Sequence, residues 1–253
     1  MFVPGAETTR TIMRERIARL YRSISSGDSP FATALWRMRH GHPFNTIRKR
    51  VRGSENLIAY GGSLLHNVTV DIRGRGNRVL IAPRCILNSV AIRVRGDGHT
   101  LIIGPGCVFS EGGDLWLEDG SGTLEIGAGS TFVDAQLAVT EPGTCIRIGR
   151  DCLFAYDIEV RTGDSHAIVD ASTGRRLNPA ADVTIGDHVW VGVGCRVLKG
   201  SRLANDSVVG AGSVVTHAFD EPGVVIAGVP ARVTRTGIGW QRERGAAPAV
   251  PEG

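Results

Sequence analysis

The stretch IGDHVWVGVGCRVLKGSRLANDSVVGAGSVV, residues 185–215, decides the fold. An aliphatic residue recurs at every sixth position, and a small residue stands four positions after most of these anchors. The six anchors are Ile185, Val191, Val197, Leu203, Val209 and Val215. A period of six matches neither an α-helix nor a single strand. It is typical of a coil of three short strands with one aliphatic side chain pointing inward from each face, so it predicts a parallel β-helix.

The same rhythm continues upstream with longer units. Ile58, Ile81, Ile103, Ile126 and Ile148 each begin a unit, at spacings of 22 or 23 residues. A coil of three six-residue units needs about eighteen residues, which leaves four or five over. The surplus falls in the glycine-containing stretches RGRGN, RGDGHT, EDGSGT and TEPGT, whose composition is typical of turns. We therefore expect an all-β chain of about seven to eight coils, with small bulged corners along one edge.

The rhythm breaks once, between Ile148 and Ile185. These two anchors are 37 residues apart, one coil plus about nineteen residues. The excess is HAIVDASTGRRLNPAADVT, residues 166–184, with His166 at its root. An insertion of this size leaves a repeat stack as an extended loop, and loops on a rigid scaffold are where sites usually form.

Cysteine usage and hydropathy narrow the class of protein. The 253 residues include five cysteines without a CxxC pair, which favours neither a metal site nor a disulfide framework. Cys85, Cys107, Cys152 and Cys195 fall at the small corner positions of the repeat, whereas Cys145 is off pattern. No apolar run is long enough to cross a membrane, and the start of the chain lacks the apolar region of a secretory signal. We expect a cytoplasmic protein.

Charge is concentrated at the N-terminus. Residues 1–52 hold eleven Arg or Lys and three acidic residues. Helical spacing of apolar residues predicts an amphipathic helix from about Thr9, and a second short helix is expected over residues 30–39. This basic segment either caps the repeat stack or docks the protein to an anionic polymer, a membrane surface or a synthesis complex. Without interleaved aromatics or a nucleic-acid motif, DNA and RNA are not expected partners. We therefore divide the chain into a basic helical segment (1–55), the β-helix (56–235) and a disordered tail (236–253).

Several motifs in residues 148–235 together resemble a known family. They are DSH at 164–166, an Asn before the next coil, GDHVWVG, GAGSVVT and AGVPARV. In this combination the region is similar to left-handed β-helix, hexapeptide-repeat acyltransferases, and above all to bacterial capsular and exopolysaccharide O-acetyltransferases. The resemblance implies a left-handed β-helix, a homotrimer, and acetyl-CoA lying in the groove between two prisms, without a metal.

The resemblance implies direct acetyl transfer with a histidine as general base. A sugar hydroxyl is a poor nucleophile at neutral pH, and histidine titrates close to the working pH. We expect His166 to be the base, with Asp164, Asp157 or a backbone carbonyl orienting its ring. His188 is a weaker alternative base.

Two further residues are expected beside the reacting groups. Trp190 lies between the inward-pointing Val189 and Val191, so its side chain points outward. By resemblance, Trp190 lines the groove. Asn178 matches the family's asparagine before the next coil and is expected to hold the loop.

Donor contacts follow from the resemblance alone. Val193 offers backbone groups to the pantetheine arm, and Ala211 and Thr216 lie on successive coils of the same edge. Arg232 and Arg235 are placed for the CoA phosphates, where a guanidinium forms paired hydrogen bonds, and Lys199 is a further phosphate contact.

We expect a carbohydrate acceptor in a bacterial polysaccharide or its precursor, and the basic N-terminus suits an acidic one. N-acetylation of a nucleotide-linked amino sugar is the alternative within the same chemistry. Two other classes stay open: a non-catalytic β-helix scaffold, and a metal lyase like the γ-class carbonic anhydrases. The latter needs three converging histidines or their equivalents, and the pair His166 and His188 has no obvious third member other than His217.

Overall fold

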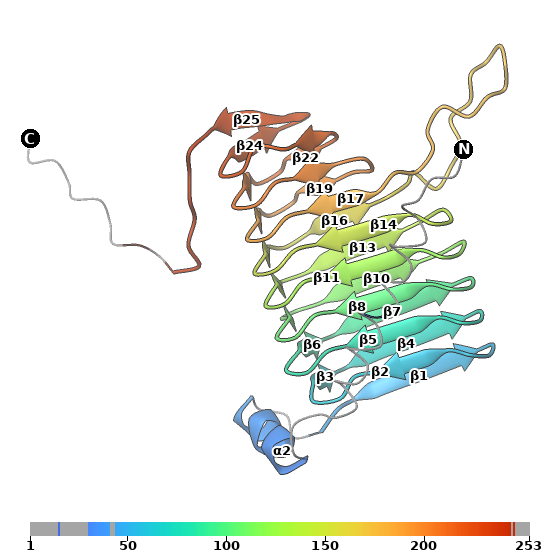
Figure 1. Cartoon of the computed structure of the whole chain (residues 1–253), viewed down its shortest axis with the longest axis vertical. Coiled ribbons are helices and arrows are strands. Elements are labelled where there is room, and N and C mark those ends of the chain that lie inside the picture. The colour runs from blue at the N-terminus through green and yellow to red at the C-terminus, as the bar shows by residue number, and fades with distance from the viewer. Residues whose placement is uncertain (1–14, 16–29, 41–43, 244, 246–253) are drawn as a thin grey trace, which may run out of the picture.

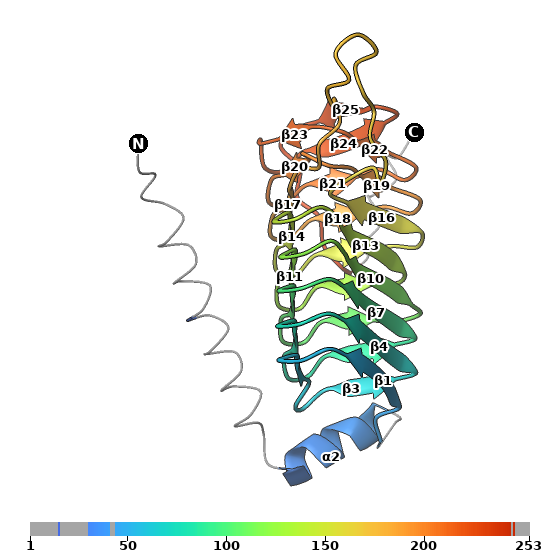
Figure 2. The same ribbon diagram turned by 90° about the vertical axis from the view of Figure 1, so that its right-hand side faces the viewer.

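Three parallel sheets form the body of the protein in the computed structural model, which describes residues 15, 30–40, 44–243 and 245 (Figures 1 and 2). Sheet A contains β1 (Ile47–Arg52), β4 (Val68–Arg73), β7 (Val90–Arg95), β10 (Gly113–Leu117), β13 (Ala135–Val139), β16 (Ile158–Arg161), β19 (Arg196–Val197) and β22 (Val214–Val215). Sheet B contains β2 (Leu57–Ala59), β5 (Arg78–Ile81), β8 (Thr100–Ile103), β11 (Thr123–Ile126), β14 (Cys145–Ile148), β17 (Val183–Ile185), β20 (Arg202–Leu203) and β23 (Ala218–Phe219). Sheet C contains β3 (Leu64–His66), β6 (Ile86–Asn88), β9 (Val108–Phe109), β12 (Thr131–Phe132), β15 (Leu153–Phe154), β18 (Trp190–Val191), β21 (Val208–Val209), β24 (Val225–Gly228) and β25 (Ala231–Arg235).

Every third strand of the chain returns to the same sheet, so the chain winds as a prism. Successive strands of a sheet pair in parallel, and the antiparallel pair β24–β25 closes the C-terminal end. The solenoid has about eight turns. The predicted left-handed parallel β-helix is confirmed.

The interior of the prism is a set of stacked columns. Ile103, Ile126, Ile148 and Ile185 are in register on neighbouring strands of sheet B, and each is at most 3% exposed. On sheet C the rings of Phe109, Phe132 and Phe154 stack with centroids 4.4 and 4.6 Å apart. All five cysteines are buried and unpaired, as the four corner positions predict. Burial raises the pKa of the Cys152 thiol to about 11, so this cysteine is a packing residue and no thiolate nucleophile.

One expected register is wrong. Ile58 pairs with Val79, two residues before the anchor Ile81, so it does not begin the first unit in the way that the later isoleucines do. Ile58 is only partly buried, at the N-terminal end of the stack where no earlier strand of sheet B covers it. Because the end coil has one open side, its apolar pattern is less strictly selected than that of the inner coils.

The surplus residues of the long units form turns between sheet A and sheet B, which build one column along the right-hand edge in Figure 1. Close stacking demands glycine in these turns. Gly74 has φ +141°, and a Cβ there would lie 1.9 Å from the backbone oxygen of Gly96 in the next turn. The extended loop leaves the same corner, from residue 162 to residue 182 between β16 and β17, slightly earlier at both ends than expected.

The two ends of the prism differ from the division made on sequence. α2 (Pro30–Arg39) is the expected short helix, and its Arg37 donates hydrogen bonds from Nε and Nη2 to the backbone oxygen of Ser63. The β-helix already begins with β1, upstream of the boundary at residue 56. The amphipathic helix expected from about Thr9 lies outside the described residues. Within those residues, no helix has the length and apolar character needed to cross a membrane.

Residues 236–243, assigned on sequence to a disordered tail, pack along the prism, on the left-hand side in Figure 1. Trp240 is 9% exposed and its Nε1 donates a hydrogen bond to the backbone oxygen of His188, at 2.8 Å. Arg242 pairs with Asp151 and also reaches the hydroxyl of Thr131. This C-terminal segment therefore covers part of sheet C.

Candidate active site

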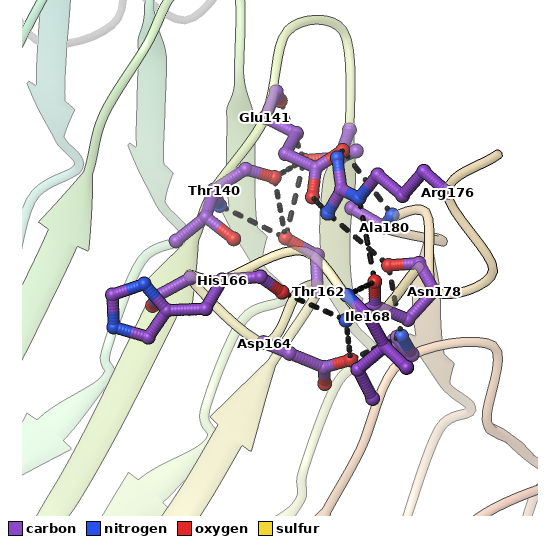
Figure 3. A network of polar contacts seen from close by, with 12 residues as sticks. Thr140, Glu141, Thr162, Asp164, His166, Ile168, Arg176, Asn178 and Ala180 are labelled. Atoms are coloured by element: carbon purple, nitrogen blue, oxygen red, sulfur yellow. Dashed lines mark hydrogen bonds and ion pairs between the residues drawn. The ribbon is translucent and has the colours of Figure 1, made fainter. Parts of the chain in front are cut away.

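The loop between β16 and β17 presents His166 at the corner between sheets A and B. The side chain is exposed and lines a cavity of about 380 Å³. Figure 3 shows its ring pointing away from the polar network that holds the loop. Among the described residues, no side chain hydrogen-bonds the imidazole. The cavity is lined by Glu118, Asp119, Thr140, Glu141, Ser165, His166, Ala167 and Arg176.

Asn178 holds both sides of the loop root. It is 8% exposed, and its Nδ2 donates hydrogen bonds to the backbone oxygen of His166 and to Oδ2 of Asp164, both at 2.8 Å (Figure 3). Its Oδ1 accepts a hydrogen bond from the backbone nitrogen of Ile168 at 2.6 Å. A buried amide saturated in this way fixes the chain direction on either side of the histidine.

Asp164 belongs to this network and does not touch the imidazole of His166. Its Oδ2 accepts hydrogen bonds from Nζ of Lys199 and from Asn178, and these two contacts hold the pKa of the carboxyl below its usual value. Lys199 also donates to the backbone oxygen of Asn178, at 3.2 Å. No contact therefore supports the expected role of Asp164 as a direct partner of the His166 ring. Lys199, which was expected to contact a CoA phosphate, pairs with Asp164 at the base of the loop.

A second ion pair closes the far side of the loop. The guanidinium of Arg176 binds both carboxylate oxygens of Glu141, which lies in the turn one coil below. Glu141 also accepts a hydrogen bond from the backbone nitrogen of Ala180, at 3.3 Å. The Arg176 hydrogen bonds lower the pKa of Glu141, so the pair stays charged at neutral pH. The base of the loop is thus pinned to the rigid stack on both sides.

The ring of His188 packs against neighbouring side chains. Its ring stacks on Trp240 with centroids 4.1 Å apart, and its Nδ1 lies 2.9 Å from Oδ1 of Asp206. Its Nε2 is 3.8 Å from a carboxylate oxygen of Asp151. These contacts hold the ring of His188 against Trp240 and Asp206, whereas the side chain of His166 is exposed at a cavity. Asp157, the other carboxylate named on sequence, pairs with Arg196.

Trp190 projects from sheet C, as its position between buried valines predicts. It is 40% exposed, and its ring centroid lies 6.1 Å from that of Trp240. The loop of His166 leaves the corner between sheets A and B, so one chain does not bring His166 and Trp190 together.

The residues expected to contact the acetyl donor lie on the outer surface of the prism. Val193 and Ala211 occupy equivalent turns of successive coils, where the backbone nitrogen of Gly212 donates to the oxygen of Val193 at 2.8 Å. Val193 is 49% exposed, a large apolar surface for a turn residue. Thr216, Arg232 and Arg235 are also exposed.

Sequence reasoning missed a group of residues on the outer face of sheet A. Trp116, Thr140 and Arg161 line a second cavity, which shares Glu118, Thr140 and Ser165 with the first. Trp116 and Arg161 occupy outward positions of strands, and their alignment depends on the register between coils. Aligning the repeat unit of β16 with the two units before it would have put Trp116 and Arg161 in one row, and this alignment is the signal that could have found them.

A metal site of the kind considered on sequence needs several ligands in one place. Within the described residues no group of three or more His, Cys, Asp or Glu side chains converges in that way.

Comparison with known proteins now places the fold. Residues 182–217 match the family model described as bacterial transferase hexapeptide (six repeats). Among curated proteins, the chain is 35% identical over 121 residues to a polysialic acid O-acetyltransferase of Neisseria meningitidis, covering 48% of this chain and 56% of that protein. It is 34% identical over 118 residues to the polysialic acid O-acetyltransferase of Escherichia coli O1:K1, covering 46% of this chain and 36% of that protein.

Solved structures agree over more of the chain. The polysialic-acid-specific acetyltransferase NeuO superimposes with a TM-score of 0.70 at 27% identity, over 78% of this chain and 89% of that one. The polysialic acid O-acetyltransferase OatWY gives 0.62 at 28% identity, over 79% and 94%. The resemblance to bacterial hexapeptide-repeat O-acetyltransferases that the motifs predict is therefore confirmed. The sequence matches span only about a third to a half of the two curated relatives' own length.

Proposed function

We propose that the protein is an O-acetyltransferase that moves an acetyl group from acetyl-CoA to a sugar hydroxyl of a bacterial capsular or extracellular polysaccharide, or of its precursor, in the cytoplasm. The similarity to two polysialic acid O-acetyltransferases, in sequence and in fold, supports this class of acceptor. The observation that carries the proposal is the presentation of His166: an exposed imidazole on a loop held by a buried asparagine, at the wall of a cavity.

The chemistry needs one base and no acyl-enzyme intermediate. The imidazole of His166 takes the proton of the sugar hydroxyl as its oxygen attacks the thioester carbonyl. The tetrahedral intermediate then collapses with cleavage of the C–S bond, and the imidazolium returns the proton to the departing thiolate of CoA. Backbone N–H groups are the donors that suit the oxyanion of this intermediate. This route uses no metal.

The separation of His166 from Trp190 supports a site shared between chains. In a homotrimer of such prisms, the corner that carries His166 faces the flank of a neighbouring prism. Trp190 and the exposed Val193 and Ala211 then form the donor side of the groove. Arg232 and Arg235, exposed on the C-terminal strand pair, provide the charge that suits the CoA phosphates.

The test is release of CoA from acetyl-CoA by the full chain, with and without a panel of acidic and neutral bacterial polysaccharides. His166→Ala is compared with wild type and with His40→Ala, which removes an exposed histidine immediately after α2 and far from the loop. We expect glycan-dependent release from wild type and His40→Ala, and a fall of at least about a hundredfold for His166→Ala. Full activity in a folded His166→Ala would refute the base assignment. Failure of wild type to bind acetyl-CoA would refute the proposed function.

A further inference from the structure

A slot on the outer face of sheet A opens beside His166. Three outward residues of neighbouring strands are in register there: Trp116 on β10, Ala138 on β13 and Arg161 on β16. With strands about 4.8 Å apart, Trp116 and Arg161 stand roughly 9.6 Å from each other, and the methyl group of Ala138 forms the floor between them. A small residue between two large ones leaves a gap, and a cavity of about 340 Å³ occupies it.

Two arginines lie on the side of Trp116 that faces away from the slot. The guanidinium carbons of Arg93 and Arg95 lie 5.7 and 5.9 Å from the centroid of the Trp116 ring, and both residues come from β7, on the opposite side of β10 from the slot. The indole is therefore supported by cations from the β7 side, and Trp116 is also a lining residue of the cavity.

Three residues that line the slot each carry a buried polar atom without a hydrogen-bond partner. Among the described residues, three buried side-chain polar atoms have no hydrogen-bond partner: Oδ1 of Asp114, Oγ1 of Thr140 and Nε of Arg161. All three residues line this one cavity. Thr140 is only 3% exposed, so an unsatisfied hydroxyl there is costly unless something binds it. The set holds one acceptor, one donor and one hydroxyl that acts as either.

The slot continues directly into the cavity of His166. Both cavities share Glu118, Thr140 and Ser165. Nη2 of Arg161 donates to the hydroxyl of Ser165 at 3.2 Å, and Ser165 is the residue before His166. A ligand bound on Trp116 can therefore extend through the joined cavities to the imidazole of His166.

We infer that the slot binds a pyranose ring of the glycan acceptor, stacked on Trp116 and hydrogen-bonded to Asp114, Thr140 and Arg161, so that the adjoining sugar is led to His166. An apolar ring face with donors and acceptors around its rim complements a sugar, which has C–H groups on its faces and hydroxyls at its edge. Among the lining side chains, carboxylates outnumber guanidiniums, so the ring in the slot is recognised by its hydroxyls rather than by attraction of a polyanion. This inference rests on the proposed acetyl transfer, because it assigns the acceptor side of the same site.

Filling or flattening the slot tests the inference. Ala138→Leu puts a branched side chain on the floor, and Trp116→Ala removes the platform, whereas Trp116→Phe keeps an aromatic face. Ala218→Leu on β23 adds the same bulk at an outward position of sheet B and serves as the matched control. Polysialic acid fragments and neutral dextran fragments are the probes. Their binding to the full chain is followed by saturation-transfer NMR and calorimetry, and their acetylation by steady-state kinetics.

We expect Ala138→Leu and Trp116→Ala to weaken binding of the preferred glycan, and to raise its KM, by about tenfold or more, the loss that one stacked and hydrogen-bonded ring implies. The KM for acetyl-CoA and the mass in solution stay unchanged. Trp116→Phe, which keeps an aromatic face, loses less than Trp116→Ala, and Ala218→Leu stays close to wild type. Unaltered glycan binding in both slot variants would overturn the inference. A change of oligomeric mass in them would overturn it too, because the face would then be an interface between copies of the chain.

The two proposals fail in different ways. If wild type binds glycan in an Ala138-sensitive manner without acetylating it, the slot stands and the proposed reaction falls. If wild type acetylates a glycan and the slot variants do so with unchanged KM, the reaction stands and the slot falls.

Discussion

Nδ2 of Asn178 donates a hydrogen bond to the backbone oxygen of His166 at 2.8 Å, across the base of a loop that separates the two residues by twelve positions. The same side chain accepts a hydrogen bond from the backbone nitrogen of Ile168. One buried amide therefore fixes the chain on both sides of Ala167, while the imidazole itself is left exposed. The position of the proposed base depends on a residue that touches no reacting atom.

Replacing Asn178 with alanine should slow acetyl transfer. The substitution leaves the backbone groups of His166 and Ile168 without partners, and small displacements of a catalytic group cost up to about a hundredfold in rate. We expect kcat to fall about ten- to a hundredfold with an unchanged KM for acetyl-CoA. Asn88→Ala removes a similar bridge between coils, from Asn88 to the oxygen of Ser110, and should leave kcat unaltered. Equal losses in the two variants would mean that Asn178 acts only through general stability.

The Asp164–Lys199 pair predicts an acid-dependent contribution to stability. The contacts with Lys199 and Asn178 lower the pKa of Asp164 from its unfolded value of 3.8. The contribution is therefore fully present above pH 3.8 and is lost as pH falls through the lower folded pKa. The difference in unfolding free energy between wild type and Asp164→Asn, measured by urea denaturation, should be constant from neutral pH to about pH 5 and shrink at lower pH. A difference that persists unchanged into strong acid would contradict the ion pair.

His99 predicts a second pH dependence, in the opposite half of the stack. The ring is 1% exposed, and its Nδ1 accepts a hydrogen bond from the backbone nitrogen of Gly122 at 3.1 Å, so the neutral form is required there. Burial lowers the pKa of His99 below its ordinary 6.5. Unfolding then takes up a proton below pH 6.5, and the unfolding free energy should decrease as the pH falls from about 7.5 to about 5.5.

His99→Gln should flatten this pH dependence, at the expense of some stability at neutral pH. Replacing the exposed His217 with glutamine is the control and should leave the slope as in wild type. Equal slopes in wild type and His99→Gln would show that other groups cause the loss.

The periodic part of the molecule was predictable because each inner coil meets a coil on both sides. Ile126 and Ile148 have to be aliphatic, so the spacing of six survives in the sequence and reveals the prism. Where a coil has a free side the rule weakens, and Ile58 was assigned to the wrong register. His166, Trp190 and Asn178 were found because they interrupt or flank the rhythm.

Contacts between distant parts of the chain left no such signal. The partner of Asp164 is Lys199, 35 residues away and on another coil, so spacing alone suggested the histidine two residues along. The slot at Trp116 depends on the alignment of three coils. Trp240 lies in a segment whose glycines and alanines resemble a disordered tail, and only its contact with His188 shows that it is packed.

Trp240→Ala should destabilise the protein by about 3 kcal/mol, the usual cost of deleting a buried tryptophan. It removes the stacking partner of His188 and the hydrogen bond to that residue's backbone oxygen. Trp240→Phe keeps the stack and loses the hydrogen bond, so its cost should be about 1 kcal/mol. Chemical denaturation of the three proteins measures both values. An alanine variant as stable as wild type would show that the C-terminal segment adds nothing to the fold.

The most direct test of His166 as the general base follows a labelled acetyl group from acetyl-CoA in wild type and in His166→Gln. Label on the glycan and on the intact protein is measured through a single turnover. Direct transfer with His166 as base predicts that wild type acetylates the glycan without labelling the protein, and that the folded variant transfers at least about a hundredfold more slowly. Wild-type rates in His166→Gln, or an acetylated protein that forms and then decays, would contradict it.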